Sequence, residues 1–295
     1  MIQPRRPARL TAEARGSCLL MRLISSLEQA KALDRLNEAG QRVARLLPPG
    51  RARDALHGVW LGHPLHPLLV QVPVGTWLSA SLLDAWPGNE KASRRLVLAG
   101  LAASVPATLA GGTDWAEQHE QQMRVGLVHA VANGAAIACY AVSAVLPARA
   151  RILRLAGLAA VGAGGYLGGH IAYRQSAGAN QAEPVPHLVE PGWHDLMPLA
   201  ELADREPTKK MLGDVPVVAL RDGDDLHVLA DWCSHLSGPL SGGDYHDGCL
   251  TCPWHGSTFR VSDGAVTRGP ATAPQPAFRT RVTGGLIQVC LPGAG

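Results

Sequence analysis

Two short loops rich in cysteine and histidine constrain this chain more than any other feature of its sequence. Cys-Ser-His (233–235) is followed, after sixteen intervening residues, by Cys-Pro-Trp-His (252–255). Each loop offers one sulfur and one imidazole nitrogen, so the two loops can approach a shared metal centre from opposite sides. We therefore predict that Cys233, His235, Cys252 and His255 are metal ligands.

Two kinds of metal centre use these donors. In a [2Fe-2S] cluster, Cys233 and Cys252 would hold one iron, while His235 and His255 would hold the outer iron. Replacing two thiolates by neutral imidazoles makes such a cluster less negative and raises its reduction potential. A tetrahedral zinc site with two Cys and two His is the alternative.

The residues around the four ligands resemble the Rieske ferredoxin-like family. The resemblance rests on Cys-Ser-His-Leu-Ser-Gly-Pro-Leu (233–240), Cys-Pro-Trp-His-Gly-Ser-Thr-Phe (252–259), Asp-Gly (263–264) and Gly-Pro (269–270). It runs over about residues 192–292 and implies a small antiparallel β domain with a [2Fe-2S] cluster at the tip of two hairpin loops. Short β-prone runs at 215–220, 226–230 and 286–290 agree with that fold, because turn residues bound each of them.

Positions that depart from the family pattern indicate which kind of Rieske protein this chain resembles. In the Rieske proteins of respiratory and photosynthetic complexes a disulfide joins the two loops, and its half-cystines correspond to Gly238 and Trp254 here. The aromatic hydroxyl that hydrogen-bonds a cluster cysteine in those proteins is replaced by Phe259, whereas Ser257 remains as a donor. We therefore expect a reduction potential in the lower part of the Rieske range, closer to that of dioxygenase ferredoxins.

The sequence after the second loop bears on oxygen chemistry. About forty residues follow His255 and none of them is a histidine, so a 2-His-1-carboxylate iron site cannot be built there. We expect an electron-transfer component of an oxidoreductase system rather than a terminal oxygenase.

The first half of the chain carries four long apolar stretches, at about residues 65–85, 96–113, 125–146 and 152–173. At about 1.5 Å per residue, each is long enough as a helix to cross a hydrocarbon layer of about 30 Å. We predict an all-α four-helix transmembrane bundle followed by the small all-β domain. The alternative for the first half is a buried, Ala-rich helical bundle.

Ionisable residues gather near one end of these predicted helices. They are His63 and His66 at the start of the first, Asp114 at the end of the second, His129 in the third and His170 near the end of the fourth. Because successive helices run in opposite directions, all five lie on one membrane face, from which the Rieske-like domain also emerges. Ionisable groups are costly at membrane depth, so this cluster predicts a functional site.

A second resemblance covers about residues 57–180. His-Pro-Leu-His-Pro-Leu-Leu-Val-Gln-Val-Pro (63–73), Gly-Thr-Asp-Trp (112–115) and Tyr-Leu-Gly-Gly-His-Ile-Ala-Tyr-Arg (166–174) are similar to the DUF2231 family of predicted four-helix membrane proteins. The resemblance implies a membrane domain and brings no activity with it.

Several ligands fit the predicted membrane histidines. Haem b could be held by His66 and His129, or by His129 and His170, with Asp114 or a second His supporting the ligands. A quinone pocket or a metal site is a second hypothesis. In a third, His63 and His66 cap the first helix while His129 and His170 hydrogen-bond between helices.

These patterns divide the chain into four segments. Residues 1–56 form a basic segment with an amphipathic helix, which lies on an anionic membrane surface or else meets solvent or a partner. Residues 57–175 form the membrane domain, 176–191 a mobile linker and 192–295 the Rieske-like domain. Residues 1–20 lack the apolar core of a secretory signal.

Basic residues near the helix ends are shared evenly between the two membrane faces, so the positive-inside rule does not decide the orientation. We expect a multi-pass protein of the cell membrane with its cluster domain in the cytoplasm, because no signal for exporting a folded cluster domain is visible.

Two classes of function follow from the sequence. In the first, the protein is a membrane-anchored carrier that passes single electrons between a membrane donor, quinol or haem, and a soluble acceptor. In the second, it is a membrane-bound redox sensor or assembly factor whose cluster state alters the helical bundle. The expected partners are lipid and a redox protein or quinone, and not nucleic acid.

Overall fold

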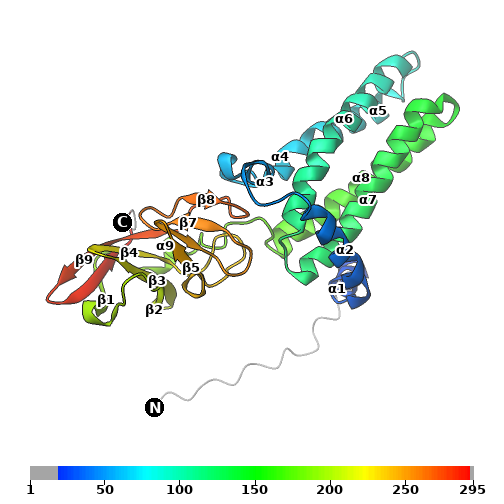
Figure 1. Cartoon of the computed structure of the whole chain (residues 1–295). Coiled ribbons are helices and arrows are strands. Elements are labelled where there is room, and N and C mark those ends of the chain that lie inside the picture. The colour runs from blue at the N-terminus through cyan, green and yellow to red at the C-terminus, as the bar shows by residue number, and fades with distance from the viewer. Residues whose placement is uncertain (1–18, 293–295) are drawn as a thin grey trace.

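The computed structural model describes residues 19–292 and shows a helical half and a strand half joined end to end (Figure 1). The sequence before residue 19, in which no secretory signal is expected, lies outside the described residues.

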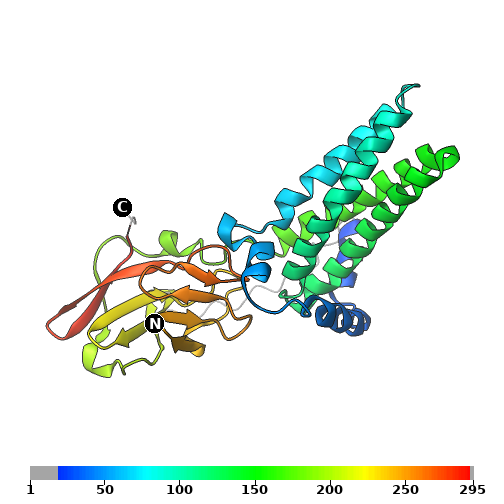
Figure 2. The same ribbon diagram turned by 45° about the horizontal axis from the view of Figure 1, so that its top comes forward.

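The helical half consists of short helices at its start and two long hairpins after them. Its elements are α1 (Leu19–Glu28), η2 (Lys31–Leu33), α2 (Asp34–Ala44), α3 (Arg51–His57), η3 (Val59–Leu61), α4 (His66–Leu69), α5 (Gln71–Leu83), α6 (Glu90–Trp115), α7 (Glu120–Val145), η4 (Pro147–Arg149), α8 (Ala150–Gly169) and the π-helical turn η5 (His170–Arg174). Helix α5 packs mainly against α6, and α7 against α8. The turns of both hairpins point away from the strand half (Figure 2).

Three described helical segments are long and apolar enough to cross a membrane, namely residues 90–115, 120–145 and 147–174. The first stretch predicted from the sequence, 65–85, is divided instead into α4 and the 13-residue α5. Pro73 explains the division, because its ring nitrogen has no proton to donate to the carbonyl oxygen of Leu69, the last residue of α4. At about 1.5 Å per residue, α5 alone spans roughly 20 Å, which is less than the hydrocarbon layer. The count of four spanning helices is therefore not confirmed.

The two hairpins meet through a small aromatic core. The rings of Trp77 on α5 and Tyr140 on α7 stack with their centres 4.5 Å apart, and both residues are buried. Gly157 on α8 lies directly against the Tyr140 ring, and a Cβ at that position would come within 2.8 Å of it. Small residues thus let large rings fill the centre of an otherwise Ala-rich bundle.

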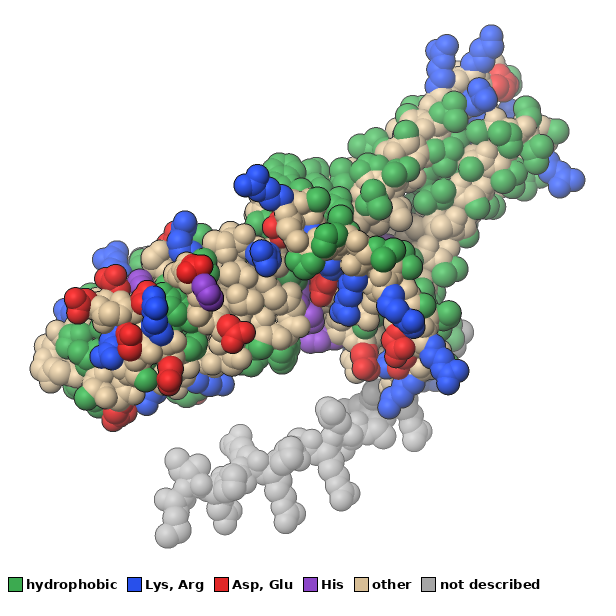
Figure 3. Space-filling view, in the orientation of Figure 1, with side chains coloured by type: hydrophobic (Ala, Val, Ile, Leu, Met, Phe, Trp, Pro, Cys, Tyr) green, Lys and Arg blue, Asp and Glu red, His purple; other side chains and the backbone are tan. Residues whose placement is uncertain are grey.

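Apolar side chains also cover the outside of the hairpins (Figure 3), where Leu78, Leu98, Val105, Leu109 and Val131 are exposed. Lys and Arg side chains gather at the far tip of the hairpins and again around the short N-terminal helices. An apolar belt between two charged ends is the surface expected of a membrane-spanning bundle.

The short helices α1 and α2 pack on α7. Ile24 is buried beside Val125, and the guanidinium of Arg124 donates to both carboxylate oxygens of Asp34, at 2.7 and 2.8 Å. Leu36 and Val43 remain exposed. The segment thus has one face on the bundle and exposed apolar side chains on another, and its contact with a membrane surface stays a prediction.

The strand half is all-β, as the sequence predicted. Its strands are β1 (His194–Pro198), β2 (Thr208–Leu212), β3 (Val215–Asp222), β4 (Asp225–Ala230), β5 (Asp244–His246), β6 (Cys249–Thr251), β7 (Thr258–Arg260), β8 (Val266–Arg268), β9 (Ala277–Thr283) and β10 (Leu286–Cys290). They form two antiparallel sheets, in the orders β1-β10-β9-β4-β3-β2 and β5-β6-β7-β8. One apolar cluster lies on the larger sheet, and a second, around Leu250 and Phe259, joins the two sheets beneath the cysteine loops.

The segment 176–191, predicted to be a mobile linker, contains the short helix α9 (Val185–Leu188). Val185 and Val189 are buried in the core of the strand half, and the backbone N–H of Gln181 donates to the carbonyl of Ser234 at 2.9 Å. Its described conformation is therefore packed rather than extended, and movement of the strand half stays a prediction.

Candidate metal centre

The four predicted ligands come together at the end of the strand half that faces the helices. Cys233 and His235 lie in the loop between β4 and β5, and Cys252 and His255 in the loop between β6 and β7. The imidazole rings of His235 and His255 have their centres 5.1 Å apart.

The two loops have the same backbone hydrogen bonds. The carbonyl of Cys233 accepts from the N–H of Ser237 at 2.8 Å, and the N–H of Cys233 donates to the carbonyl of Gly238 at 2.9 Å. Cys252 repeats both bonds with Gly256, at 3.1 Å, and Ser257, at 2.8 Å. Each cysteine therefore opens a closed turn that fixes the direction of its side chain.

Both turns need a left-handed residue four positions after the cysteine. Gly256 takes this conformation at φ 74°, where glycine has no steric penalty. Ser237 takes it at φ 59°, at the cost of a conformation that non-glycine residues seldom adopt.

The histidines are in the form that binds metal. Burial, followed by the charge of His255, lowers the pKa of His235 to about 3. Burial, followed by the charges of His119 and Arg45, lowers the pKa of His255 to about 4. Both imidazoles are thus neutral near pH 7, as coordination requires.

The two thiols form a coupled pair. The thiol of Cys233 donates to the sulfur of Cys252, which lowers the pKa of Cys252 to about 7, and the same hydrogen bond, with burial, raises the pKa of Cys233. One proton therefore leaves readily, while the second leaves only when a cation takes its place.

A buried polar atom without a partner tests whether a metal cluster fits here. Nδ1 of His235 is buried and makes no hydrogen bond, so its lone pair is free for a metal. Among residues 19–292, no three His, Cys, Asp or Glu side chains surround a position for a single metal ion. Two thiols joined by a hydrogen bond, two neighbouring neutral imidazoles and a free ring nitrogen are the donors that a [2Fe-2S] cluster with mixed ligands uses, so the residues fit this group.

Ser257 lies where the sequence predicted a hydrogen bond to the cluster. Its hydroxyl oxygen accepts from the N–H of Ala271 at 2.9 Å, and its own proton is directed to the sulfur of Cys233, whose pKa this contact lowers. Phe259 is fully buried nearby and has no hydroxyl to offer.

Gly238 and Trp254 meet, although they cannot form a disulfide. A Cβ on Gly238 would lie 2.8 Å from Sγ of Cys252 and 3.1 Å from the Trp254 ring. The two loops are therefore held by close contact of an indole with bare backbone.

Gln275, which the sequence analysis missed, supports the first loop from below. Its side-chain oxygen accepts from the N–H of Ser234 at 3.0 Å, and its amide nitrogen donates to the carbonyls of Ala230, at 2.8 Å, and Trp232. Gln275 has no motif of its own, and only the tertiary fold brings it to the loop.

The helical half covers the ligand loops. The ring of His119, at the start of α7, lies with its centre 5.6 Å from that of Trp254 and 6.1 Å from that of His255. Asp54 on α3 accepts from the N–H of Gly269 at 3.0 Å, and Gly269 also lies against His57. Neither His57 nor His119 was singled out in the sequence, because each stands alone between motifs.

The predicted membrane histidines do not form one cluster. His66 and His129 lie together with ring centres 6.2 Å apart. His170 instead pairs with Glu28, 2.9 Å away, and His63 is exposed, with Nδ1 3.1 Å from the carbonyl of Pro64. Asp114 binds His57 at 2.8 Å rather than any of the four.

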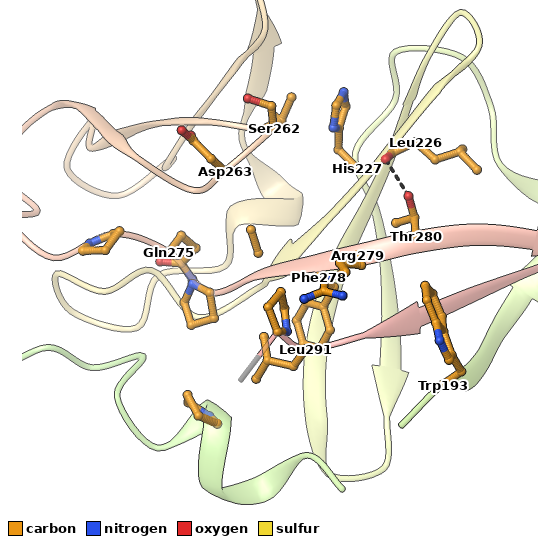
Figure 4. A pocket seen from close by; sticks show the side chains of 16 residues that line it. Trp193, Leu226, His227, Ser262, Asp263, Gln275, Phe278, Arg279, Thr280 and Leu291 are labelled. Atoms are coloured by element: carbon orange, nitrogen blue, oxygen red, sulfur yellow. Dashed lines mark hydrogen bonds between the residues drawn. The ribbon is translucent and has the colours of Figure 1, made fainter. Parts of the chain in front are cut away.

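A groove on the strand half lies apart from the ligand loops (Figure 4). It is lined by Trp193, His227, Asp263 and Phe278 among others, and Thr280 donates to the carbonyl of Leu226 at 3.0 Å along its wall. It contains none of the four predicted ligands.

Comparison with known proteins agrees with both resemblances. Residues 192–279 match the family described as "Rieske [2Fe-2S] domain", and residues 62–181 match "Predicted membrane protein (DUF2231)". The anthranilate 1,2-dioxygenase ferredoxin subunit of Burkholderia cepacia is 34% identical over 97 residues, which make up 33% of this chain and 90% of that protein. Ferredoxin CarAc of Metapseudomonas resinovorans is 32% identical over 78 residues, 26% of this chain and 73% of that protein. Among solved structures, the ferredoxin of carbazole 1,9a-dioxygenase from Nocardioides aromaticivorans IC177 shares 30% identity, with a TM-score of 0.33, over 34% of this chain and 97% of that chain.

Proposed function

The chain belongs to the Rieske [2Fe-2S] domain family, and from this premise we propose that it is a membrane-anchored carrier of single electrons between a membrane redox partner and a soluble acceptor protein. One observation supports this most directly. The buried, unpartnered Nδ1 of His235 shares a site with three other donors, at the surface where the strand half meets the apolar helices.

In this proposal Cys233, His235, Cys252 and His255 hold a [2Fe-2S] cluster, which supplies a one-electron redox centre when bound. The two matched turns fix the directions of the cysteine sulfurs. Burial keeps both imidazoles neutral, and Ser257 withdraws charge from Cys233 through its hydroxyl proton. These residues bind and tune the centre, and they perform no bond chemistry of their own.

The helical half is proposed as the anchor. Three apolar helices and the match to a family of predicted membrane proteins support a multi-pass location in the cell membrane. Because the hairpin turns point away from the strand half, the ligand loops would lie just outside the lipid, and we place them on the cytoplasmic side. The soluble acceptor would be a redox protein, since the relatives are named as ferredoxins of dioxygenase systems.

A membrane-bound redox sensor is the second candidate, because contacts join the ligand loops to the helices. The hydrogen bond between Asp54 and Gly269 could pass a change at the loops on to α3. A sensor would hold the cluster without turning over electrons.

The test uses the full chain, purified in detergent without oxygen. We expect non-haem iron and acid-labile sulfide in equal amounts and the low average g-value that imidazole ligation gives in electron paramagnetic resonance. In His255→Cys that low average g-value should disappear whether or not a cluster remains. One zinc ion, with neither iron nor sulfide, would overturn the ligand assignment.

A second measurement separates the two candidates. The carrier should be reduced by a quinol or by a membrane redox centre and reoxidised by a soluble redox protein over many cycles. A cluster that no quinol or reductase turns over, while proteolysis of the helices changes with its redox state, would favour the sensor.

A further inference from the structure

The two hairpin halves of the helical bundle bring two imidazoles opposite each other. His66, on α4, and His129, on α7, have ring centres 6.2 Å apart and ring planes at 77°. Since α4 leads into the first hairpin and α7 begins the second, each half contributes one ring.

The two rings are held in the same way. Nδ1 of His66 lies 2.8 Å from the carbonyl oxygen of Ala107 on α6, and Nδ1 of His129 lies 2.8 Å from that of Gly164 on α8. A carbonyl oxygen can only accept, so Nδ1 carries the proton in both rings. The free lone pair of each ring is therefore on Nε2. Metal-binding histidines often have this tautomer, because a carbonyl partner holds the proton on the other ring nitrogen.

A glycine lies beside each ring, four residues after the carbonyl that holds it. A Cβ on Gly111 would come within 2.6 Å of the His66 ring, and one on Gly168 within 3.1 Å of the His129 ring. The second hairpin thus repeats the arrangement of the first: a histidine on one helix, and a carbonyl and a glycine one turn apart on its partner. The repeat therefore presents the two rings in equivalent settings, one from each hairpin.

The amide of Asn133 lies near His129 but does not point at the lone pair on Nε2 of that ring. Its amide nitrogen is 3.4 Å from Nδ1 and 3.2 Å from Nε2 of His129, and it donates to the backbone carbonyl of His129 at 2.9 Å. Nearly equal distances to both ring nitrogens place the amide over the face of the ring rather than in its plane.

The spacing of the rings fits two bonds to one metal. Metal–nitrogen bonds of about 2.0 Å on either side of an ion put two imidazole centres roughly 6 Å apart. Within residues 19–292, no third His, Cys, Asp or Glu joins the pair to complete the shell of a bare ion. A site with two opposed imidazoles and no further protein donor suits an iron whose other four ligands come from a macrocycle.

We propose that the helical half binds one haem b, with His66 and His129 as axial ligands and the porphyrin seated in the seam between the two hairpins. This seam is the looser contact of the bundle, since each hairpin packs mainly within itself. His129 follows His119 by ten residues of α7, a rise of about 15 Å, so the haem would lie inside the bundle below the Rieske ligands. Its role as the membrane partner of the cluster rests on the proposed function, whereas the haem site does not.

The full chain is produced with added hemin, purified in detergent and passed through gel filtration. Haem is then counted as its pyridine complex, and the cluster by its paramagnetic resonance signal in the same sample. We expect one haem per chain with the spectrum of a low-spin, bis-imidazole iron. His66→Leu and His129→Leu should each lower the retained haem roughly tenfold or more, while His63→Leu, a matched change at an exposed site, should retain it.

The cluster signal shows whether each variant has folded. A further variant, His129→Gly, tests whether His129 is itself an axial ligand. Imidazole added to that variant should restore the low-spin spectrum, which a purely structural histidine would not do. Wild-type protein with an intact cluster and no haem would overturn the haem site and leave the proposed function standing. Retention of haem in both leucine variants would overturn the assignment of ligands. Haem without any cluster would instead overturn the proposed function.

Discussion

The ring centre of His119, the N-cap residue of α7, lies 6.1 Å from the ring centre of His255, a predicted cluster ligand on the other half of the molecule. The position of His119 is fixed, because its side chain accepts from the backbone of Gln122 while the Gln122 side chain accepts from the N–H of His119 at 2.9 Å. A helix cap thus orients the residue that covers the second ligand loop.

This contact predicts the effect of His119→Asn. Asparagine is also a good N-cap, so α7 should keep its start while the ring over Trp254 is lost. We expect faster amide hydrogen exchange in residues 252–256 of the full-length protein. His187→Asn, at a side chain that is 74% exposed, should leave that exchange unchanged. Equal protection of the loop in all three proteins would show that His119 does not cover it.

Gly238→Ala should impair cluster binding. The new methyl group would lie 2.8 Å from Sγ of Cys252, which is shorter than any tolerated contact, and the sulfur would have to move away from the site. Iron and labile sulfide per chain should fall strongly. Gly242→Ala is the matched control, because its methyl group would meet only Pro253 at 3.7 Å. A full complement of cluster in Gly238→Ala would contradict the close contact.

Ser257→Ala should lower the reduction potential of the cluster. The hydroxyl proton withdraws charge from Cys233, and its loss makes the reduced, more negative state less favourable. The change also leaves the buried N–H of Ala271 without its acceptor, which should cost about 1–3 kcal/mol of folding free energy.

Redox titration followed by paramagnetic resonance gives the potential, and thermal unfolding gives the stability. Ser262→Ala makes the same substitution at an exposed position and should change neither. An unchanged potential in Ser257→Ala would exclude the hydrogen bond to Cys233.

Asp222 should make the strand half sensitive to acid. Its carboxylate accepts from the hydroxyl of Tyr245 and from Nε of Arg205, both at 2.7 Å, and these contacts hold its pKa below the usual 3.8. A pKa that is lower in the folded state gives stability that is complete above the ordinary pKa and is lost as the pH falls through the folded value.

The difference in unfolding midpoint between wild type and Asp222→Asn should therefore be largest near pH 6 and should narrow below about pH 4. Tryptophan fluorescence measures this without relying on the cluster. A difference that stays constant down to pH 3 would mean that Asp222 does not titrate with folding.

The sequence alone predicted the four candidate ligands and determined the division of the chain into two halves. Cys233, His235, Cys252 and His255 stand in short loops, so local spacing restricts where their side chains can lie, and the fold then needs only to bring two loops together. The apolar stretches were equally readable, because the length and composition of α6, α7 and α8 suffice to identify them. The break before Pro73 could also have been read from the sequence, although the four-helix prediction did not allow for it.

Only the tertiary structure decided which distant residues meet. It brought the rings of His66 and His129 close together, paired His170 with Glu28, and paired Asp114 with His57. It also placed His119 and Gln275 beside the ligand loops. Helical periodicity specifies the face of one helix but not the rotation of its neighbour. These pairings therefore depend on how rings such as Trp77 and Tyr140, and glycines such as Gly111 and Gly168, pack the hairpins together.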